Sequence, residues 1–535
     1  MRTPISVILL SCLTLTGHTT PNIRTGTIPS WVTPVVPDRN RQPFPKDISN
    51  GYYYELQDQQ TDLLLQTEYF HSIRHLVNRS GVQDGSEVSV TFAPQYQEVV
   101  FHRIDVIRDG GIIDELRSGH LHVAEEEPDA ANFQYTGKKR AYFTLPDIRE
   151  GDRIEIAYSV IGFNPVFHGK YATQQYFTRS TAVCNYFRTI ITSRGRPLYF
   201  LAHNDALLPG RELAGSRLIY RWSNPVLAED SNPAAGEARV PYVGITEYKD
   251  WREVAGWALN TFDHYRAPLP LRLVEKISSW RQIAAGNPDL FANLATRFVQ
   301  NEIRYLAIET GANSHRPHSP AEVLSRGYGD CKDKALLLVS ILRHEGIPAV
   351  AALISAEGGR SLPGSAPSPG LFNHVIVAIR RPGDRWLYVD PTLAAQRGEL
   401  SELYIPDYGY ALLVRDGEDS LRTIKPGQAS YTILEQLDAR FDDTSRLLVT
   451  TTFAGGAADQ LRRSFDENSR KDIEAAYVKY YAAWIPGIKM TASLRSDDDS
   501  VANRITTRES YAVPTIWGLD REGRRSFVYL VKMVR

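Results

Sequence analysis

The stretch Tyr328-Gly329-Asp330-Cys331-Lys332-Asp333-Lys334 decides how the central part of this chain folds. A tight turn ends at its cysteine, and an apolar run then continues to Leu342 before a glycine and a proline interrupt the pattern. These features predict one helix of about four turns, with Asp330 as its N-cap and its end near Gly346. Cys331 then lies in the first turn, where unpaired backbone N–H groups and the helix dipole favour an anion such as a thiolate.

The same cysteine also fits two ordinary structural roles. It could be a small buried hydrophobic residue, or it could form half of a disulfide. Lys332 and Lys334 beside it would favour a thiolate, whereas Asp330 and Asp333 offset that field. The stretch by itself leaves these alternatives open.

A predicted β-hairpin further along the chain supplies a histidine and a carboxylate. Residues 371–379 are rich in β-branched side chains, a turn signal follows, and residues 385–391 form a second short strand. If the loop has about four to five residues, counting back from it places His374 opposite Asp390 or Pro391. A histidine beside a carboxylate is held in one tautomer and is stabilised as imidazolium, as the base of a thiol enzyme requires. The alternatives are a packed or solvated histidine and an aspartate that serves the turn.

The order Cys331, His374, Asp390, with the residues around each, resembles the transglutaminase-like superfamily. The surroundings that carry the resemblance are Tyr-Gly-Asp-Cys-Lys-Asp-Lys-Ala, Phe-Asn-His-Val-Ile-Val and Tyr-Val-Asp-Pro-Thr, preceded by the stretches 303–309 and 320–324. The resemblance implies a papain-like thiol fold in which a cysteine at a helix N-terminus meets a histidine and an aspartate on adjacent strands. It is closest to bacterial exported proteins that join such a domain to an uncharacterised β-rich N-terminal domain.

Length and composition exclude several classes of protein. A chain of 535 residues is too long for one hydrophobic core and predicts about three domains. Lysine plus arginine (61) nearly equals aspartate plus glutamate (62), so no basic surface for nucleic acid or membrane lipids is indicated. No apolar run approaches the roughly 20 residues of a transmembrane helix. We expect no cofactor and no metal: His315 and His318 are three residues apart, but Pro317 between them disfavours a helical metal pair.

The fold class predicted from these patterns is multidomain α+β. It comprises a β-sandwich-like N-terminal domain, a central transglutaminase-like (papain-like) domain and a small β-rich C-terminal domain. The expected segments are a signal peptide at 1–17, a proline-rich linker at 18–50, the N-terminal domain at 51–248, the thiol domain at 251–415 and the C-terminal domain at 430–535. Residues 358–370, rich in glycine, proline and serine, predict an exposed and mobile loop, or a gate because they lead directly to His374.

The N-terminal stretch predicts export. Arg2 precedes a short apolar core at residues 5–13, which is too short to span a bilayer, and cleavage could follow Gly17. Lipidation at Cys12 is the alternative, because the residues before it loosely resemble a lipoprotein signal. We therefore expect a periplasmic or cell-envelope location. Cys184, in a different predicted domain from Cys331, is expected to be structural.

The predicted function is that of a thiol enzyme acting on peptide or amide bonds. Cys331 would attack a carbonyl, His374 would carry the proton and Asp390 would orient His374, giving a thioester. Water then makes the protein a protease or amidase, and an amine makes it a transglutaminase. The expected partner is a peptide or protein substrate, including cell-wall peptide; no nucleic acid is expected, and the oligomeric state is not predicted. The alternative is a non-catalytic binding or scaffold protein of the cell envelope that keeps the thiol fold.

Overall fold

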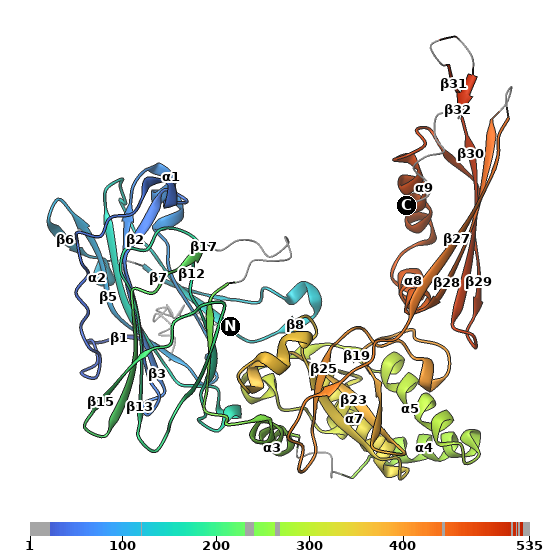
Figure 1. The fold of residues 1–535 in the computed structure, drawn as a ribbon, viewed down its shortest axis with the longest axis horizontal. Coiled ribbons are helices and arrows are strands. Elements are labelled where there is room, and N and C mark those ends of the chain that lie inside the picture. Colours follow the sequence, from blue (N-terminus) through green and yellow to red (C-terminus); the bar gives the residue numbers. More distant parts are fainter. Residues whose placement is uncertain are drawn as a thin grey trace, which may run out of the picture.

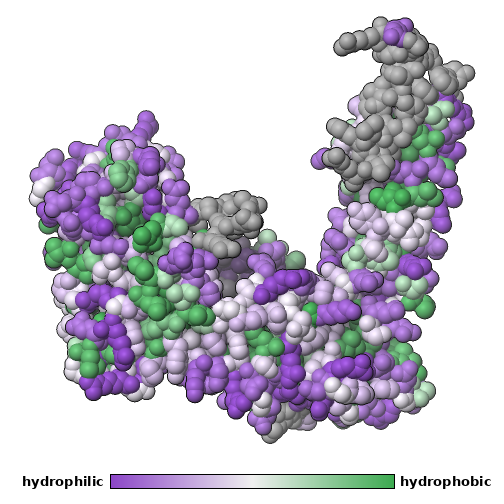
Figure 2. Space-filling model, viewed as in Figure 1, coloured by the Kyte–Doolittle hydropathy of each residue, from purple (hydrophilic) through white to green (hydrophobic). Residues whose placement is uncertain are grey.

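The computed structural model describes residues 22–118, 120–229, 240–262, 268–440, 444–514, 517–519, 522 and 525–527. The predicted signal peptide at 1–17, with Cys12, lies outside these residues. Figure 1 shows three bodies in chain order: a β-rich N-terminal domain, a central domain with most of the helices, and a C-terminal domain. The N- and C-terminal domains stand apart on either side of the central domain, whose visible surface is largely hydrophilic (Figure 2).

The N-terminal domain is built around one large sheet. Its elements are β1 (Ile23–Thr25), β2 (Tyr52–Asp62), β3 (Thr67–Leu76), α1 (Arg79–Gly85), β4 (Val88–Phe92), β5 (Glu98–Arg108), β6 (Gly111–Asp114), α2 (Glu115–Ser118), β7 (His120–Glu125), β8 (Gln134–Tyr135), β9 (Lys139–Thr144), β10 (Arg153–Ile161), β11 (Ala172–Tyr176), β12 (Thr178–Arg179), β13 (Tyr186–Ser193), β14 (Tyr199–His203), β15 (Gly210–Ala214), β16 (Arg217–Ser223), β17 (Ala228–Glu229) and β18 (Tyr242–Thr246). Within the described residues, this sheet has nine strands in the order β1-β5-β10-β3-β2-β13-β16-β15, with β6 beside β5.

Two small sheets complete the sandwich that the alternating strands predict. The sheet β4-β9-β7 and the strands β5 and β10 share one hydrophobic core, to which Phe92, Phe101 and Phe143 contribute. The sheet β11-β18-β14 packs on β13 and β16 around a second core that contains Trp222. The stretch expected to be a proline-rich linker lies along this domain, because β1 pairs with β5 and Thr33 N donates to Gln60 Oε1 at 3.0 Å.

The central domain places one buried helix against an antiparallel sheet. Its elements are α3 (Trp251–Thr261), α4 (Leu271–Ala284), α5 (Pro288–Glu302), β19 (Arg304–Tyr305), β20 (Ala307–Ile308), α6 (Pro320–Arg326), β21 (Tyr328–Gly329), α7 (Cys331–His344), β22 (Ala349–Ile354), β23 (His374–Arg381), β24 (Arg385–Val389), β25 (Tyr410–Leu413) and β26 (Arg422–Thr423). The sheet order is β24-β23-β22-β25-β26. Every residue of α7 from Cys331 to Leu342 is buried, because the helix lies between this sheet and the helices of the domain.

The loop that was expected to be exposed and mobile is folded against the N-terminal domain. It forms two short 3₁₀ turns, Gly359–Gly364 and Pro369–Leu371, and the side chains of Leu362 and Pro369 are buried. The hydroxyl of Thr246 at the end of β18 donates to the carbonyl of Pro367 at 2.7 Å. The predicted exposure holds for part of the loop, such as Arg360 and Gly364, while Leu362 and Pro369 are buried. Glycine and proline content indicates local turns and not what those turns pack against.

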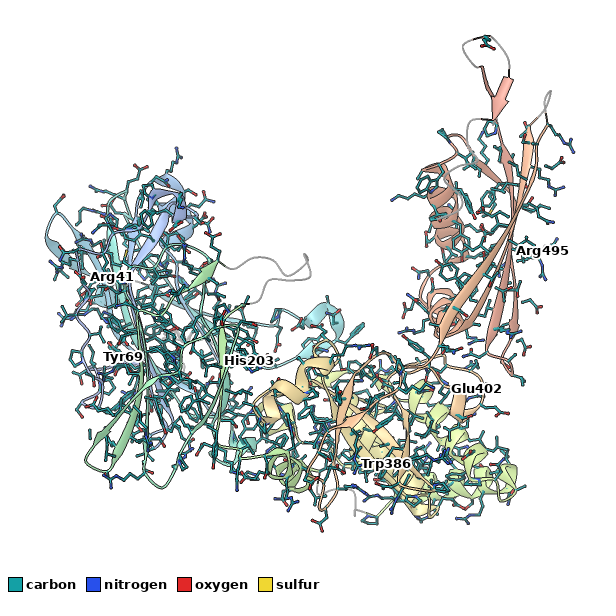
Figure 3. All side chains as sticks on the ribbon, in the orientation of Figure 1. Arg41, Tyr69, His203, Trp386, Glu402 and Arg495 are labelled. Atoms are coloured by element: carbon teal, nitrogen blue, oxygen red, sulfur yellow. The ribbon has the colours of Figure 1, made fainter. Side chains whose placement is uncertain are left out.

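The C-terminal domain is a sheet with helices on one face. Its elements are β27 (Ala429–Asp438), β28 (Ser445–Gly455), α8 (Gly456–Glu467), α9 (Arg470–Ala482), β29 (Lys489–Asp499), β30 (Arg504–Val513), β31 (Trp517–Leu519) and β32 (Arg525–Phe527). The long strands pair antiparallel in the order β27-β28-β30-β29. Arg495 of β29 projects from the sheet on the side opposite α8 and α9 (Figure 3). No helix in the described part of the chain is long and apolar enough to cross a membrane.

Candidate active site

The N-terminus of α7 presents Cys331 at the bottom of a cavity. Asp330 is the N-cap, and its carboxylate accepts the backbone N–H of Asp333 at 3.2 Å. The Asp333 carboxylate in turn accepts the N–H of Asp330, which completes a capping box. Gly329 permits this close turn, since a Cβ there would lie 2.7 Å from the Cβ of Asp333. The predicted helix start is therefore where the structure has it, with Cys331 as the first helical residue and 6% exposed.

His374 and Asp390 form a hydrogen-bonded pair beneath the cavity. His374 Nε2 lies 2.9 Å from Asp390 Oδ2, and the carboxylate is fully buried. The Tyr408 hydroxyl donates to the same oxygen at 2.8 Å. Thr392 donates its backbone N–H at 2.8 Å and its hydroxyl at 2.6 Å to Oδ1. Burial favours the neutral acid, but His374 and Thr392 outweigh it, so the pKa of Asp390 is lowered and the group is a carboxylate.

The contact between His374 and Asp390 arises from a register different from the predicted one. The strands β23 and β24 pair with Arg381 opposite Arg385, so the loop has three residues and not the expected four to five. Asp384 in this loop adopts a left-handed backbone with φ of 52°, which lets the shorter turn close. The strand pairing ends at Val377 opposite Val389. His374 therefore does not lie directly opposite Asp390 or Pro391; the side chains meet diagonally, where the second strand has already ended.

His374 and Cys331 line the same cavity, and the thiol is among the groups that raise the pKa of the imidazole. Asp390 occupies Nε2, so Nδ1 is the ring nitrogen left for the thiol. Burial disfavours a charged imidazole, but attraction to Asp390 and the hydrogen bonds to Asp390 and Cys331 outweigh it and raise the pKa of His374 to about 11. Of the three side chains predicted from the sequence, His374 is thus bonded to Asp390 and lines the cavity together with Cys331.

The cavity above Cys331 has a volume of about 300 Å³. Aromatic and apolar side chains form much of its lining, among them Trp257, Phe262, Leu353 and Phe372. A larger cavity of about 620 Å³ lies on the C-terminal sheet, lined by arginines and hydroxyl side chains and by neither cysteine nor histidine. Chemistry therefore favours the smaller cavity as the candidate site, since it alone of the two combines a cysteine thiol with a histidine.

Comparison with known proteins agrees with this geometry. Residues 281–391 match the family model described as the transglutaminase-like superfamily. The central domain belongs to the transglutaminase-like superfamily. Residues 64–227 match a second model, "Domain of Unknown Function with solved-structure structure (DUF3857)". No curated protein matches the chain.

Solved structures extend the likeness beyond the transglutaminase-like domain. A crystal structure described as a "putative protease" from Parabacteroides distasonis superposes with a TM-score of 0.51 at 14% identity, over 87% of this chain and 94% of that one. The shared fold thus includes more than the central domain. A "putative cysteine protease" from Cytophaga hutchinsonii is 12% identical over 64% of this chain and 78% of its own, with a TM-score of 0.15, too low to support an argument.

The two lysines beside the nucleophile of the transglutaminase-like domain have different partners. Lys332 is buried, pairs with Asp330 and lies 3.6 Å from Glu309 at the cavity wall. Lys334 points away and donates to the carbonyls of Gln300 and Ile303 at the end of α5, at 3.3 and 2.7 Å. Only Lys332 therefore places its charge at the cavity, and Asp330 offsets it there.

His315 and His318, the two histidines considered as a metal pair, contact different groups. His315 lines the cavity, where burial and the nearby Lys332 lower its pKa to about 4 and keep it neutral. His318 instead lies 3.2 Å from Asp333 Oδ2. Among the residues that the structure describes, no cluster of three or more histidine, cysteine, aspartate or glutamate side chains could hold a metal ion.

Three residues of the transglutaminase-like site were not identified from the sequence. Tyr408 holds Asp390 and comes from a loop before β25, and no local pattern marked it. Tyr305 lines the cavity from β19 and belongs to a stretch that contributed to the family resemblance, which is the signal that could have found it. Gln134 lines the same cavity from the N-terminal domain, and nothing in its sequence neighbourhood indicated this.

Proposed function

We propose that the transglutaminase-like domain is a thiol enzyme that acts on peptide or amide bonds through a thioester intermediate. The observation that supports this most is the orientation of His374, with one ring nitrogen bonded to the buried Asp390 and the other toward Cys331. This arrangement keeps the imidazole charged next to the sulfur and aims its proton at the cavity.

In the proposed acylation, the Cys331 thiolate attacks the substrate carbonyl carbon. A sulfur–carbon bond forms while the carbonyl π electrons move to oxygen. His374 then gives its proton to the leaving nitrogen, the carbon–nitrogen bond breaks, and the acyl group remains on sulfur. In deacylation, His374 takes a proton from water or an amine as that nucleophile attacks, and the sulfur–carbon bond breaks.

Two donors are available for the negative oxygen of the tetrahedral intermediate. The backbone N–H of Cys331, at the first position of α7, has no recorded acceptor in the described part of the chain. We propose the Tyr305 hydroxyl as the second donor, because Tyr305 lines the same cavity as Cys331. Burial first, and then the charges of Cys331 and Asp330, raise the pKa of Tyr305, which therefore keeps its proton.

As substrate we propose a peptide, with hydrolysis favoured over amine transfer. The apolar, aromatic lining of the cavity suits a peptide side chain more than a highly charged group. The description of the Parabacteroides distasonis structure as a "putative protease" is in keeping with this. From the expected export signal at 1–17 we further propose that the substrate lies outside the cytoplasm, with cell-wall peptide as one candidate.

The test is the rate at which iodoacetamide alkylates Cys331 between pH 5.5 and 9, read by mass spectrometry on the folded protein. Because His374 stays protonated over this range, we expect fast labelling that changes little with pH. An ordinary thiol, with a pKa near 8.5, loses most of its reactivity at pH 6. Cys184 is the internal control, since burial and Glu55 raise its pKa to about 11.

The second step separates the possible reactions. Peptide mixtures are incubated with the protein, with and without a fluorescent primary amine, and compared with Cys331→Ala. Cleavage that needs Cys331 supports a protease or amidase, and amine incorporation supports a transglutaminase. Labelling of Cys331 that is slow and follows an ordinary thiol would overturn the proposal and favour the scaffold alternative.

A further inference from the structure

The N-terminal domain reaches into the wall of the transglutaminase-like cavity. Its strand β8 pairs in parallel with β20, with Gln134 beside Ala307. The backbone N–H of Ala307 donates to the carbonyl of Phe133 at 2.9 Å, and that of Glu309 donates to Tyr135 at 2.8 Å. The two-residue strand β8 of the N-terminal domain thus forms part of the wall of the cavity in the transglutaminase-like domain.

The side chain of Gln134 meets Tyr305 inside this wall. Tyr305, in β19, lies two residues before Ala307, the strand partner of Gln134, and the side chains of Gln134 and Tyr305 line the same cavity. The amide of Gln134 lowers the pKa of Tyr305, as expected when an amide N–H donates to the phenol oxygen. The proton of the hydroxyl is then free to be donated into the cavity.

We propose that Gln134 is a positioning residue that aims the Tyr305 hydroxyl at the oxyanion, so that the active site is complete only when the N-terminal domain is docked. This inference rests on the proposed thioester chemistry and deepens it. Gln134 touches no reacting atom in this scheme and acts through Tyr305 alone.

The segment that carries Gln134 is held firmly in place. The carboxylate of Glu127 accepts the backbone N–H groups of Thr136 and Gly137 at 2.7 and 2.6 Å. The amide of Gln95 donates to the carbonyl of Gly137 at 3.1 Å. These bonds fix the backbone on which Gln134 sits, which lowers the entropy lost when its side chain holds Tyr305.

Other contacts between the two domains also end on residues of the cavity lining. Asn164 Nδ2 donates to the hydroxyl of Ser314 at 2.9 Å, and Trp257 Nε1 donates to the carbonyl of Val166 at 2.8 Å. Ser314 and Trp257, like Tyr305, line the cavity. The domain interface and the cavity wall therefore share side chains, which supports a role for docking in catalysis.

Two reagents separate oxyanion stabilisation from thiol activation. Acylation of Cys331 by p-nitrophenyl acetate forms a sulfur–carbon bond, passes through an oxyanion and releases p-nitrophenolate. Alkylation by iodoacetamide displaces iodide at a saturated carbon and forms no oxyanion. A residue that serves only the oxyanion should change the first rate and not the second.

The variants are made in the full chain and measured as single-turnover rates at pH 7. We expect Tyr305→Phe to slow acylation about 100-fold and Gln134→Ala about tenfold, with alkylation within about twofold of wild type for both. Gln134→Glu, which can only accept from the phenol, should be as slow as Gln134→Ala. Gln95→Ala removes a bond to the same segment without touching Tyr305, and it should acylate like wild type.

The double variant Gln134→Ala/Tyr305→Phe tests whether Gln134 acts through Tyr305. We expect it to be no slower than Tyr305→Phe alone. Additive losses, equal effects of Gln134→Ala and Gln95→Ala, or a parallel fall in alkylation would each overturn the positioning role. Fast alkylation without any acylation in wild type would overturn the thioester chemistry itself, and this inference with it.

Discussion

Two histidine–aspartate pairs lie near the start of α7, and only one of them faces a nucleophile. His374 Nε2 is 2.9 Å from Asp390 Oδ2, and His318 Nδ1 is 3.2 Å from Asp333 Oδ2. In both pairs the carboxylate is almost or completely buried. By distance and burial alone the two pairs are nearly alike.

The pairs differ in what holds the other ring nitrogen. Nε2 of His318 lies 3.1 Å from the amide of Asn313, so both of its nitrogens have polar partners inside the fold. The carboxylate of Asp333 also accepts the backbone N–H of His318 at 2.7 Å and closes the capping box of α7. Nδ1 of His374 has no such bond to the fold in the described part of the chain, and His374 lines the cavity together with Cys331. The comparison shows that a histidine–carboxylate pair has a structural role when both ring nitrogens bond to the fold. A catalytic role requires that one ring nitrogen stay available to a reactive group.

The largest expected difference between the pairs is in thiol reactivity. His374→Ala removes the imidazolium beside Cys331, so the rate of alkylation by iodoacetamide at pH 6 should fall by about 1,000-fold. His318→Ala leaves Cys331 and its partner in place, and its rate should stay within about threefold of wild type. Both rates are read from the mass of the Cys331 peptide. Equal losses in the two variants would mean that the surroundings of the histidines do not distinguish their roles.

The two aspartates should differ in what their loss does to stability. Asp390→Asn leaves His374 without the charge that stabilises it in a buried site, and we expect the free energy of unfolding to fall by about 3 kcal/mol. Asp333→Asn weakens one capping box at a helix start, which costs about 1 kcal/mol. Urea unfolding followed by circular dichroism measures both. A larger loss of unfolding free energy for Asp333→Asn would show that the His318–Asp333 pair stabilises this region more than the His374–Asp390 pair does.

The stability supplied by His374 should depend on pH. Its pKa is raised in the folded protein to about 11, above the value near 6.5 of an unfolded chain, so its contribution is complete below pH 6.5 and is lost as the pH rises toward 11. The difference in unfolding free energy between wild type and His374→Ala should therefore shrink by about 4 kcal/mol between pH 7 and 10. A constant or growing difference over this range would argue against a charged His374.

The sequence predicted the local parts of this site and missed those that depend on distant packing. Asp330 as N-cap and the helix behind Cys331 follow from residues within one turn of each other, and short-range rules suffice for them. The hairpin brought His374 to Asp390 even though its loop was one to two residues shorter than expected, because longer side chains still reach a diagonal neighbour. The predicted contact between His374 and Asp390 was therefore correct, although the predicted register of the two strands was not.

Tyr408 and Gln134 could not be predicted in this way. Tyr408 comes from an irregular loop, and Gln134 from a two-residue strand too short to carry any periodic pattern. Both reach the site only because separate elements pack there, and in the case of Gln134 because two domains dock. Such packing depends on the shape and burial of the whole fold. The spacing of residues along the chain therefore does not predict it.

The smallest expected effect concerns the hydroxyl that holds Asp390. Tyr408→Phe removes one hydrogen bond to the carboxylate but leaves the ring, the Thr392 donors and His374 in place, so the free energy of unfolding should fall by about 1 kcal/mol. Burial and the adjacent Asp390 raise the pKa of Tyr408 well above its usual range, so this loss should be the same from pH 7 to 9, below the pKa near 10 of an unfolded tyrosine, in contrast to that of His374→Ala. Alkylation of Cys331 should slow by less than about fivefold, because His374 keeps its partner. Alkylation as slow in Tyr408→Phe as in His374→Ala would contradict this. It would mean that the orientation of the Asp390 carboxylate by Tyr408, and not the charge of that carboxylate, distinguishes the His374–Asp390 pair from the His318–Asp333 pair.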